Sequence, residues 1–189
     1  MNKLLSLILL SIILFFGYGI YQNLNQTKIK KEPRVSCQKK TTTFENISNK
    51  ELILKAIELL KSNNYKVISR IEFSKYMETK ILNHISIEEA DNFLENSIKK
   101  IAKTQKTQDE INPSNEKLII DYYIYENDKE DKGKKSEKAK LYAGYLVFEF
   151  KLENKLIYKI QADYMKMDTS DIPERMDCII KSFITLKGE

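Results

Sequence analysis

Residues 141–164 read LYAGYLVFEFKLENKLIYKIQADY, two apolar runs separated by a short polar turn. In the second run, 156–164, apolar and polar residues alternate, which is typical of a strand with one buried face. The first run, 141–150, is rich in aromatic and β-branched residues, which favour strands. Glu153 and Asn154 predict a tight turn between them. The stretch therefore predicts an antiparallel hairpin.

A third apolar run precedes this hairpin. Residues 118–125, LIIDYYIY, have the same β-branched and aromatic character. The segment that follows, 126–140, is dense in charges of both signs, which predicts a solvated hairpin tip. Together the three runs predict an antiparallel meander of three strands, or a larger antiparallel sheet that contains it.

Helical patterns flank the meander on both sides. Residues 48–60 begin with the capping box SNKE and residues 86–102 begin with SIEE, and both carry apolar residues at helical spacing. DIPE at 171–174 predicts the start of a last helix, whereas YKVIS at 65–69 predicts a short further strand. This order predicts an α+β domain in which three to four helices pack with the meander.

Composition divides the chain into three parts. Residues 1–21 are mostly apolar and predict a signal anchor or a signal peptide. Residues 22–47 are polar and basic, which predicts a flexible tether. Residues 48–187 predict a single α+β globular domain. Gly17 and Gly19 satisfy the small-residue rule for signal cleavage only weakly, so the cleaved and uncleaved forms both stay open.

The expected location is the bacterial inner membrane with the domain in the periplasm, or the periplasm itself after cleavage. The abundance of Lys, Asn and Ile is typical of an AT-rich bacterial genome, and the apolar core from Leu4 to Phe16 has the length of a signal-peptide core. The basic residues between Lys28 and Lys40 favour the alternative, a cytoplasm-facing anchor, because positive charges tend to stay on the cytoplasmic side.

Two cysteines bear on the same question. Cys37 lies in the predicted tether and Cys178 in the last helix. In an exported chain they permit one disulfide, which would join the tether to that helix. In a cytoplasm-facing domain they would be two unrelated thiols.

The basic character of the chain is concentrated near its N-terminus. The net charge is +5, but seven of the 32 basic residues and one of the 27 acidic residues lie before residue 41. The remainder is nearly neutral and lacks the electrostatic signature of nucleic-acid binding. We therefore expect no nucleic-acid partner.

Residues that commonly carry catalysis are scarce. His84 is the single histidine of the sequence, and there is no glycine-rich phosphate loop. The acidic residues of 87–96, IEEADNFLEN, fit the first turns of a helix, where they favour its dipole. We expect no catalytic residue, no metal and no cofactor.

Tyrosines mark the most distinctive predicted surface. Tyr123 and Tyr125 alternate with the aliphatic residues of the first strand, and Tyr145 lies on the next strand. Either helices cover both faces of the sheet, or this face is an open platform for a partner. Because tyrosine combines a large contact area with a polar tip, it is frequent in interfaces. We therefore predict these three tyrosines as partner-binding residues.

These features favour a non-enzymatic, membrane-tethered or periplasmic domain that binds another protein. An immunity-type inhibitor of a toxin and an accessory subunit of an envelope complex both fit that description. The expected partners are another protein and, through the N-terminal segment, the inner membrane. The alternative is an envelope domain that binds a small ligand or a lipid in an apolar cavity between sheet and helices.

Overall fold

A computed structural model describes residues 12, 15, 18, 33–41, 43–73, 78–102, 116–127 and 143–188. The chain separates into two units, Met1–Pro33 and Arg34–Glu189. The three described residues that precede Pro33 are helical. The rest of the predicted signal segment, 1–21, and the first part of the predicted tether lie outside the described residues. Within the described ranges, no helix is both long enough and apolar enough to cross a membrane.

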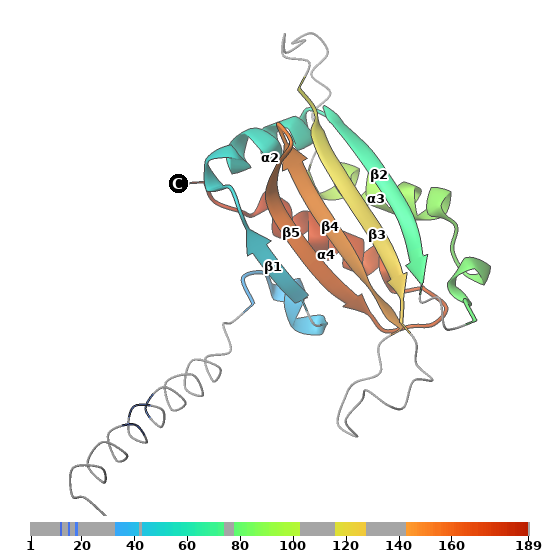
Figure 1. Ribbon diagram of the computed structural model, residues 1–189. Coiled ribbons are helices and arrows are strands. Elements are labelled where there is room, and N and C mark those ends of the chain that lie inside the picture. The colour runs from blue at the N-terminus through green and yellow to red at the C-terminus, as the bar shows by residue number, and fades with distance from the viewer. Residues whose placement is uncertain are drawn as a thin grey trace, which may run out of the picture. The chain divides into compact units, whose positions relative to one another are not determined.

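The second unit is an α+β domain built on one five-stranded sheet (Figure 1). Its elements, with 3₁₀-helices labelled η, are η1 (Ser36–Lys40), β1 (Thr43–Ile47), η2 (Lys50–Leu52), α2 (Ile53–Lys61), β2 (Tyr65–Phe73), η3 (Ile81–Asn83), α3 (Ile87–Ile101), β3 (Leu118–Glu126), β4 (Gly144–Leu152), β5 (Lys155–Tyr164) and α4 (Ile172–Ile184). The strand order in the sheet is β1-β5-β4-β3-β2. The predicted meander is confirmed, because β3, β4 and β5 pair in antiparallel fashion.

The sheet as a whole is mixed, so the prediction of a purely antiparallel sheet is wrong. β2 pairs with β3 in parallel, whereas β1 adds to β5 in antiparallel fashion at the other edge. A parallel pair needs a crossover connection, and the segment between β2 and β3 contains α3. The sequence showed strand character at 65–69 but not which strand it would pair with.

The folded domain begins before residue 48. η1 and β1 both lie within 22–47, so this part of the predicted tether is folded. The TFENI sequence of β1 shows little apolar character, because an edge strand has less surface to bury. Phe44 is 63% exposed, and the inward-pointing Glu45 accepts a hydrogen bond from the Tyr158 hydroxyl at 2.6 Å.

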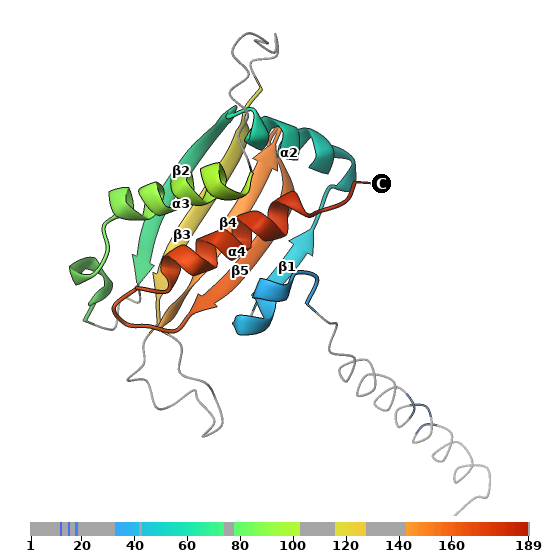
Figure 2. The same ribbon diagram turned by 180° about the vertical axis from the view of Figure 1, so that it is seen from behind.

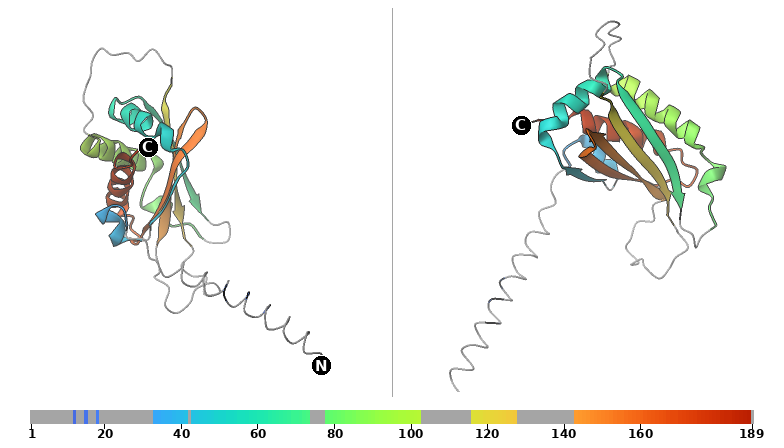
Figure 3. Two further views of the ribbon diagram at one scale, coloured as in Figure 1. Left: turned by 90° about the vertical axis from the view of Figure 1, so that its left-hand side faces the viewer. Right: turned by 45° about the horizontal axis from the view of Figure 1, so that its top comes forward.

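The described helices cover one face of the sheet. Figure 2 shows α3 and α4 across this inner face with α2 at one end, and the edge-on view in Figure 3 shows two layers. The Phe150 ring of β4 stacks on Phe183 of α4 at a centroid distance of 3.9 Å. Fully buried side chains of the sheet fill the space below the helices: Leu118, Ile120, Tyr122, Ile124, Leu146, Phe148, Phe150 and Ile160.

One of the predicted helix caps forms as expected. At α3 the Ser86 hydroxyl accepts a hydrogen bond from the Glu89 amide at 3.1 Å. At α2 the first predicted capping box is replaced by η2, and neither element has a side-chain cap. At α4 the Asp171 carboxylate bonds instead to the amides of Met165 and Lys166, so it holds the loop before the helix.

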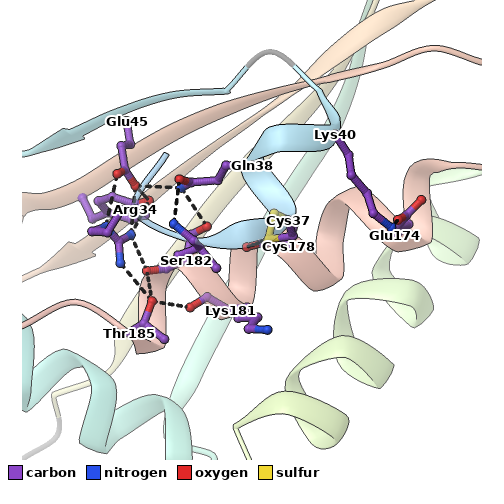
Figure 4. Close-up of a disulfide and its surroundings, with 12 residues drawn as sticks. Arg34, Cys37, Gln38, Lys40, Glu45, Glu174, Cys178, Lys181, Ser182 and Thr185 are labelled. Atoms are coloured by element: carbon purple, nitrogen blue, oxygen red, sulfur yellow. Dashed lines mark hydrogen bonds and ion pairs between the residues drawn. A yellow bond between two sulfur atoms is a disulfide. The ribbon is translucent and has the colours of Figure 1, made fainter. Parts of the chain in front are cut away.

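Residues 34–41 and 43–47, called the strap below, are fastened to α4 (Figure 4). The predicted disulfide between Cys37 and Cys178 is present and links η1 to the middle of that helix. Lys40 Nζ lies 2.6 Å from Glu174 Oε1 and adds an exposed ion pair. The disulfide closes a loop with a sequence separation of 141 residues, so the entropy of loop closure makes a large contribution to stability, about 4–5 kcal/mol in the chain-entropy model.

We expect the double variant Cys37→Ser/Cys178→Ser to lose about 2–5 kcal/mol in the free energy of unfolding. Urea denaturation measures this loss, and hydrogen exchange should show reduced protection of the β1 amides while those of β4 stay protected. The reduced wild type is the matched control and should behave as the variant does. Equal stability of the variant and the oxidised wild type would contradict this role.

Candidate functional site

A polar cluster joins the strap to α4 and the sheet (Figure 4). Arg34 donates two hydrogen bonds to Glu45, from Nε to Oε1 at 3.1 Å and from Nη2 to Oε2 at 2.9 Å. The same guanidinium donates to the Ser182 carbonyl at 2.7 Å and to Thr185 Oγ1 at 2.9 Å. Because the bidentate geometry matches the arginine fork, this pair is specific as well as strong.

Hydrogen bonding keeps the Glu45 carboxylate ionised. Burial alone would raise the pKa of Glu45, but the hydrogen bonds from Arg34, Tyr158 and Gln38 outweigh burial and hold this pKa below its usual value. Burial, followed by the hydrogen bond to Glu45, raises the pKa of Tyr158. Since these groups are paired with one another, the cluster serves to hold the strap in place.

A second set of carboxylates positions α3. The Tyr122 hydroxyl of β3 donates to Asp91 Oδ1 at 2.7 Å, and Ser69 of β2 donates to Asp91 Oδ2 at 3.0 Å. Nearby, the Tyr65 hydroxyl donates to Glu95 Oε2 at 2.7 Å. Acids of the 87–96 stretch therefore face the sheet and place α3 above β2 and β3.

The opposite side of the sheet, called the outer face, has no described helix or strand over it (Figure 1). Strand register places one row of side chains across all five strands: Phe44, Gln161, Val147, Tyr123 and Arg70. Directly opposed residues of neighbouring strands point to the same side. The residues that the register places on this face include Phe44, Asn46, Lys66, Ile68, Arg70, Glu72, Ile119, Asp121, Tyr123, Tyr125, Tyr145, Val147, Glu149, Lys151, Lys159, Gln161 and Asp163.

Six charged side chains of the outer face form a continuous charge ladder. In order they are Glu72, Arg70, Asp121, Lys151, Glu149 and Lys159, with successive N···O distances of 2.7, 2.7, 2.9, 2.7 and 2.7 Å. Burial opposes ionisation of Asp121, but hydrogen bonds from Lys151 and Arg70 outweigh it and lower its pKa. The ladder spans β2 to β5 and has no net charge.

The three predicted tyrosines lie together beside this ladder. The rings of Tyr125 and Tyr145 stack at a centroid distance of 4.8 Å, and Tyr123 meets Tyr145 edge to face at 6.3 Å. Arg70 lies over the Tyr123 ring with its guanidinium carbon 4.8 Å from the centroid and so connects the two groups. All three tyrosines are half-buried. Burial, followed by the charge of Glu72, raises the pKa of Tyr123.

The sequence predicted that the three tyrosines share a surface, but it did not predict which residues of the flanking strands lie beside them. Arg70 and Glu72 come from β2 and Phe44 comes from β1, two strands whose place in the sheet was not predicted. The alternation of polar and apolar residues in KVISRIEF, 66–73, is the signal that could have extended β2 and placed Arg70 on the same face as Ile68.

Other candidate groups do not converge on a site. His84 is exposed, and its carbonyl accepts a weak hydrogen bond from Thr169 Oγ1 at 3.4 Å. In the ranges that the structure describes, no three His, Cys, Asp or Glu side chains gather in a way that could hold a metal ion. The outer face is therefore the surface that the geometry singles out.

Comparison of the chain with protein-family models, curated proteins and solved structures gives no significant match.

The lowered pKa of Glu45 makes stability depend on pH. In the unfolded chain a glutamate titrates near pH ~4.3, whereas in the folded domain the pKa is lower. The stabilisation is therefore fully present above about pH 4.3 and is lost as the pH falls through the folded pKa. We expect Glu45→Gln to lower the free energy of unfolding by about 1–3 kcal/mol at pH 7 and to lose less stability on acidification than the wild type does.

Urea denaturation between neutral pH and about pH 3 measures this difference, since that range brackets the glutamate pKa. Tyr158→Phe removes one of the hydrogen-bond donors to Glu45, so its pH dependence should fall between those of the wild type and Glu45→Gln. Parallel stability curves for all three proteins would contradict this account.

Proposed function

We propose that the chain is a non-enzymatic bacterial domain, membrane-tethered or periplasmic, that binds another protein through the outer face of its sheet. The observation that carries the proposal is the cluster of Tyr123, Tyr125 and Tyr145 on the face that α3 and α4 leave uncovered. An immunity-type inhibitor and an accessory subunit of an envelope complex both belong to this class.

The chemistry of the outer face suits a protein partner. Tyrosine rings contribute apolar contact area, and their hydroxyls can bond to a partner's backbone or side chains at little cost in conformational entropy. Phe44 is 63% exposed at one end of the central row and Ile68 is 42% exposed beside the charge ladder. A partner that covers the tyrosines would therefore also gain apolar contacts at the margin.

The charge ladder argues against a polyanionic ligand. Its three basic side chains already bind its three acidic ones. A nucleic acid or an anionic lipid surface would have to compete with these pairs for the same cations. A partner surface of low net charge that fits over the rings is the better match.

The compartment is supported by two separate features. The disulfide between Cys37 and Cys178 suits an oxidising environment such as the periplasm, because cytosolic thiols are kept reduced. The apolar sequence before residue 22 suits export or anchoring. Both features agree with a domain held at, or released from, the outer side of the inner membrane.

The test uses the full chain as bait in detergent-solubilised membranes of the source organism. We expect a defined protein partner that is retained by the wild type and lost by Tyr125→Ala/Tyr145→Ala, since each central aromatic of an interface typically contributes about tenfold or more in affinity. Titration of the purified partner with both proteins then measures the change in affinity.

Leu54→Ala is the matched control. Leu54 is 61% exposed on α2, away from the outer face, so this variant should bind as the wild type does. Circular dichroism and melting temperature verify that each variant is folded. A partner held equally by the tyrosine variant, or the absence of any partner specific to the wild type, would rule out the outer face as the binding surface.

A further inference from the structure

β2 is a long strand at the edge of the sheet. It runs for nine residues, Tyr65–Phe73, and pairs with β3 on one side. Among the described residues, none pairs with its other side. A long edge strand with unpaired backbone groups is a template for the addition of another strand, and soluble proteins usually protect such an edge.

The direction of the backbone groups along β2 follows from one hydrogen bond. The Leu118 amide donates to the Asn64 carbonyl at 3.2 Å, so the backbone of Asn64 faces β3. Because this direction alternates along a strand, even-numbered residues up to Glu72 also face β3. The N–H and C=O groups of Tyr65, Val67, Ser69, Ile71 and Phe73 therefore point to the free edge.

The inner-face side chains of β2 are less buried than those of the strand beside them. Tyr65, Val67 and Ile71 are half-buried against the core, and Phe73 is 44% exposed. The equivalent apolar residues of β3 are fully buried. The inner-face side chains of β2 therefore keep apolar surface that the described residues do not cover.

We propose that β2 pairs with β2 of a second copy of this chain, antiparallel and centred on Ser69, so that the two sheets join into one. In this register Tyr65 lies opposite Phe73 of the other copy, and Val67 lies opposite Ile71. Every outward N–H and C=O group of β2 then finds a partner, because the residues that face the edge meet each other as hydrogen-bonded pairs.

The charges of β2 favour this register over the registers shifted by one or two residues. On the outer face the register centred on Ser69 places Lys66 opposite Glu72 of the other copy, twice in the symmetric pair. A shift of two residues in one direction places Lys66 opposite Arg70, and a shift in the other direction places Arg70 opposite itself. Like charges directly opposed across strands are destabilising. A shift by a single residue would turn the side chains to the wrong faces.

α3 lies close to the free edge of β2. At the level of Ser69, the Asp91 side chain of α3 bonds to both β2 and β3. The helix crosses β2 on the inner side of the sheet, and its N-terminal end extends past the free edge (Figure 2). Because the two-fold axis would pass beyond β2, the two copies of α3 would run antiparallel to each other on the same side of the joined sheet.

The test is the mass of the full chain in detergent micelles, measured by light scattering with the detergent contribution subtracted. We expect a dimer for the wild type and a dissociation constant raised about tenfold or more by Lys66→Glu or by Glu72→Lys, since each change creates two like-charge pairs. The double variant Lys66→Glu/Glu72→Lys restores opposite charges and should restore the dimer. Lys181→Glu, the same charge change on the exposed surface of α4, is the matched control and should leave the dimer intact.

A second measurement tests the register directly. In one strand Lys66 and Glu72 are about 20 Å apart, too far for a zero-length carbodiimide cross-link, whereas the proposed pairing brings them into contact. A mixture of ¹⁴N- and ¹⁵N-labelled copies should therefore give a 66–72 cross-link between light and heavy peptides. A monomeric wild type, a dimer indifferent to both single substitutions, or a double variant that stays dissociated would each overturn the proposal.

Discussion

The described helices are wide enough to cover one face of the five-stranded sheet, and they leave the other face uncovered. Five strands at about 4.8 Å spacing are roughly as wide as two helices packed side by side at 8–10 Å, and α3 and α4 occupy that width. The outer face is therefore stabilised without any of the described helices. It achieves this with paired charges and tyrosines, whose polar tips tolerate water while their rings pack on one another.

Tyrosine hydroxyls also position the inner layer. Tyr122 reaches Asp91 of α3, and Tyr158 reaches Glu45 of the strap. In each case a buried ring places its hydroxyl against a carboxylate, so the apolar core and the polar contact are made by one side chain. Since an unpaired buried hydroxyl is costly, each bond favours a single position of the neighbouring element over nearby alternatives.

Local features were predictable from the sequence, whereas pairings between distant segments were not. The Ser86 cap of α3 depends on residues three apart, and the β4–β5 hairpin depends on alternation and a two-residue turn; both are visible in the sequence. The parallel pairing of β2 with β3 depends on the path of the crossover connection that contains α3. The position of β1 in the sheet depends on the hydrogen bonds of Arg34 and on the disulfide that links the strap to α4. Alternation along each strand predicts which face of the sheet the three tyrosines occupy. The charge ladder could be predicted only with the register of four neighbouring strands, which the sequence does not show.

The disulfide of the strap has a topological consequence. Residues 37–178 form a covalent ring that contains all five strands together with α2 and α3. A single cut by a protease anywhere in that ring leaves the two fragments joined, so one cleavage event cannot release part of the sheet. In a compartment where proteases are abundant and refolding assistance is limited, the covalent ring would keep the domain assembled even after one peptide bond has been cut.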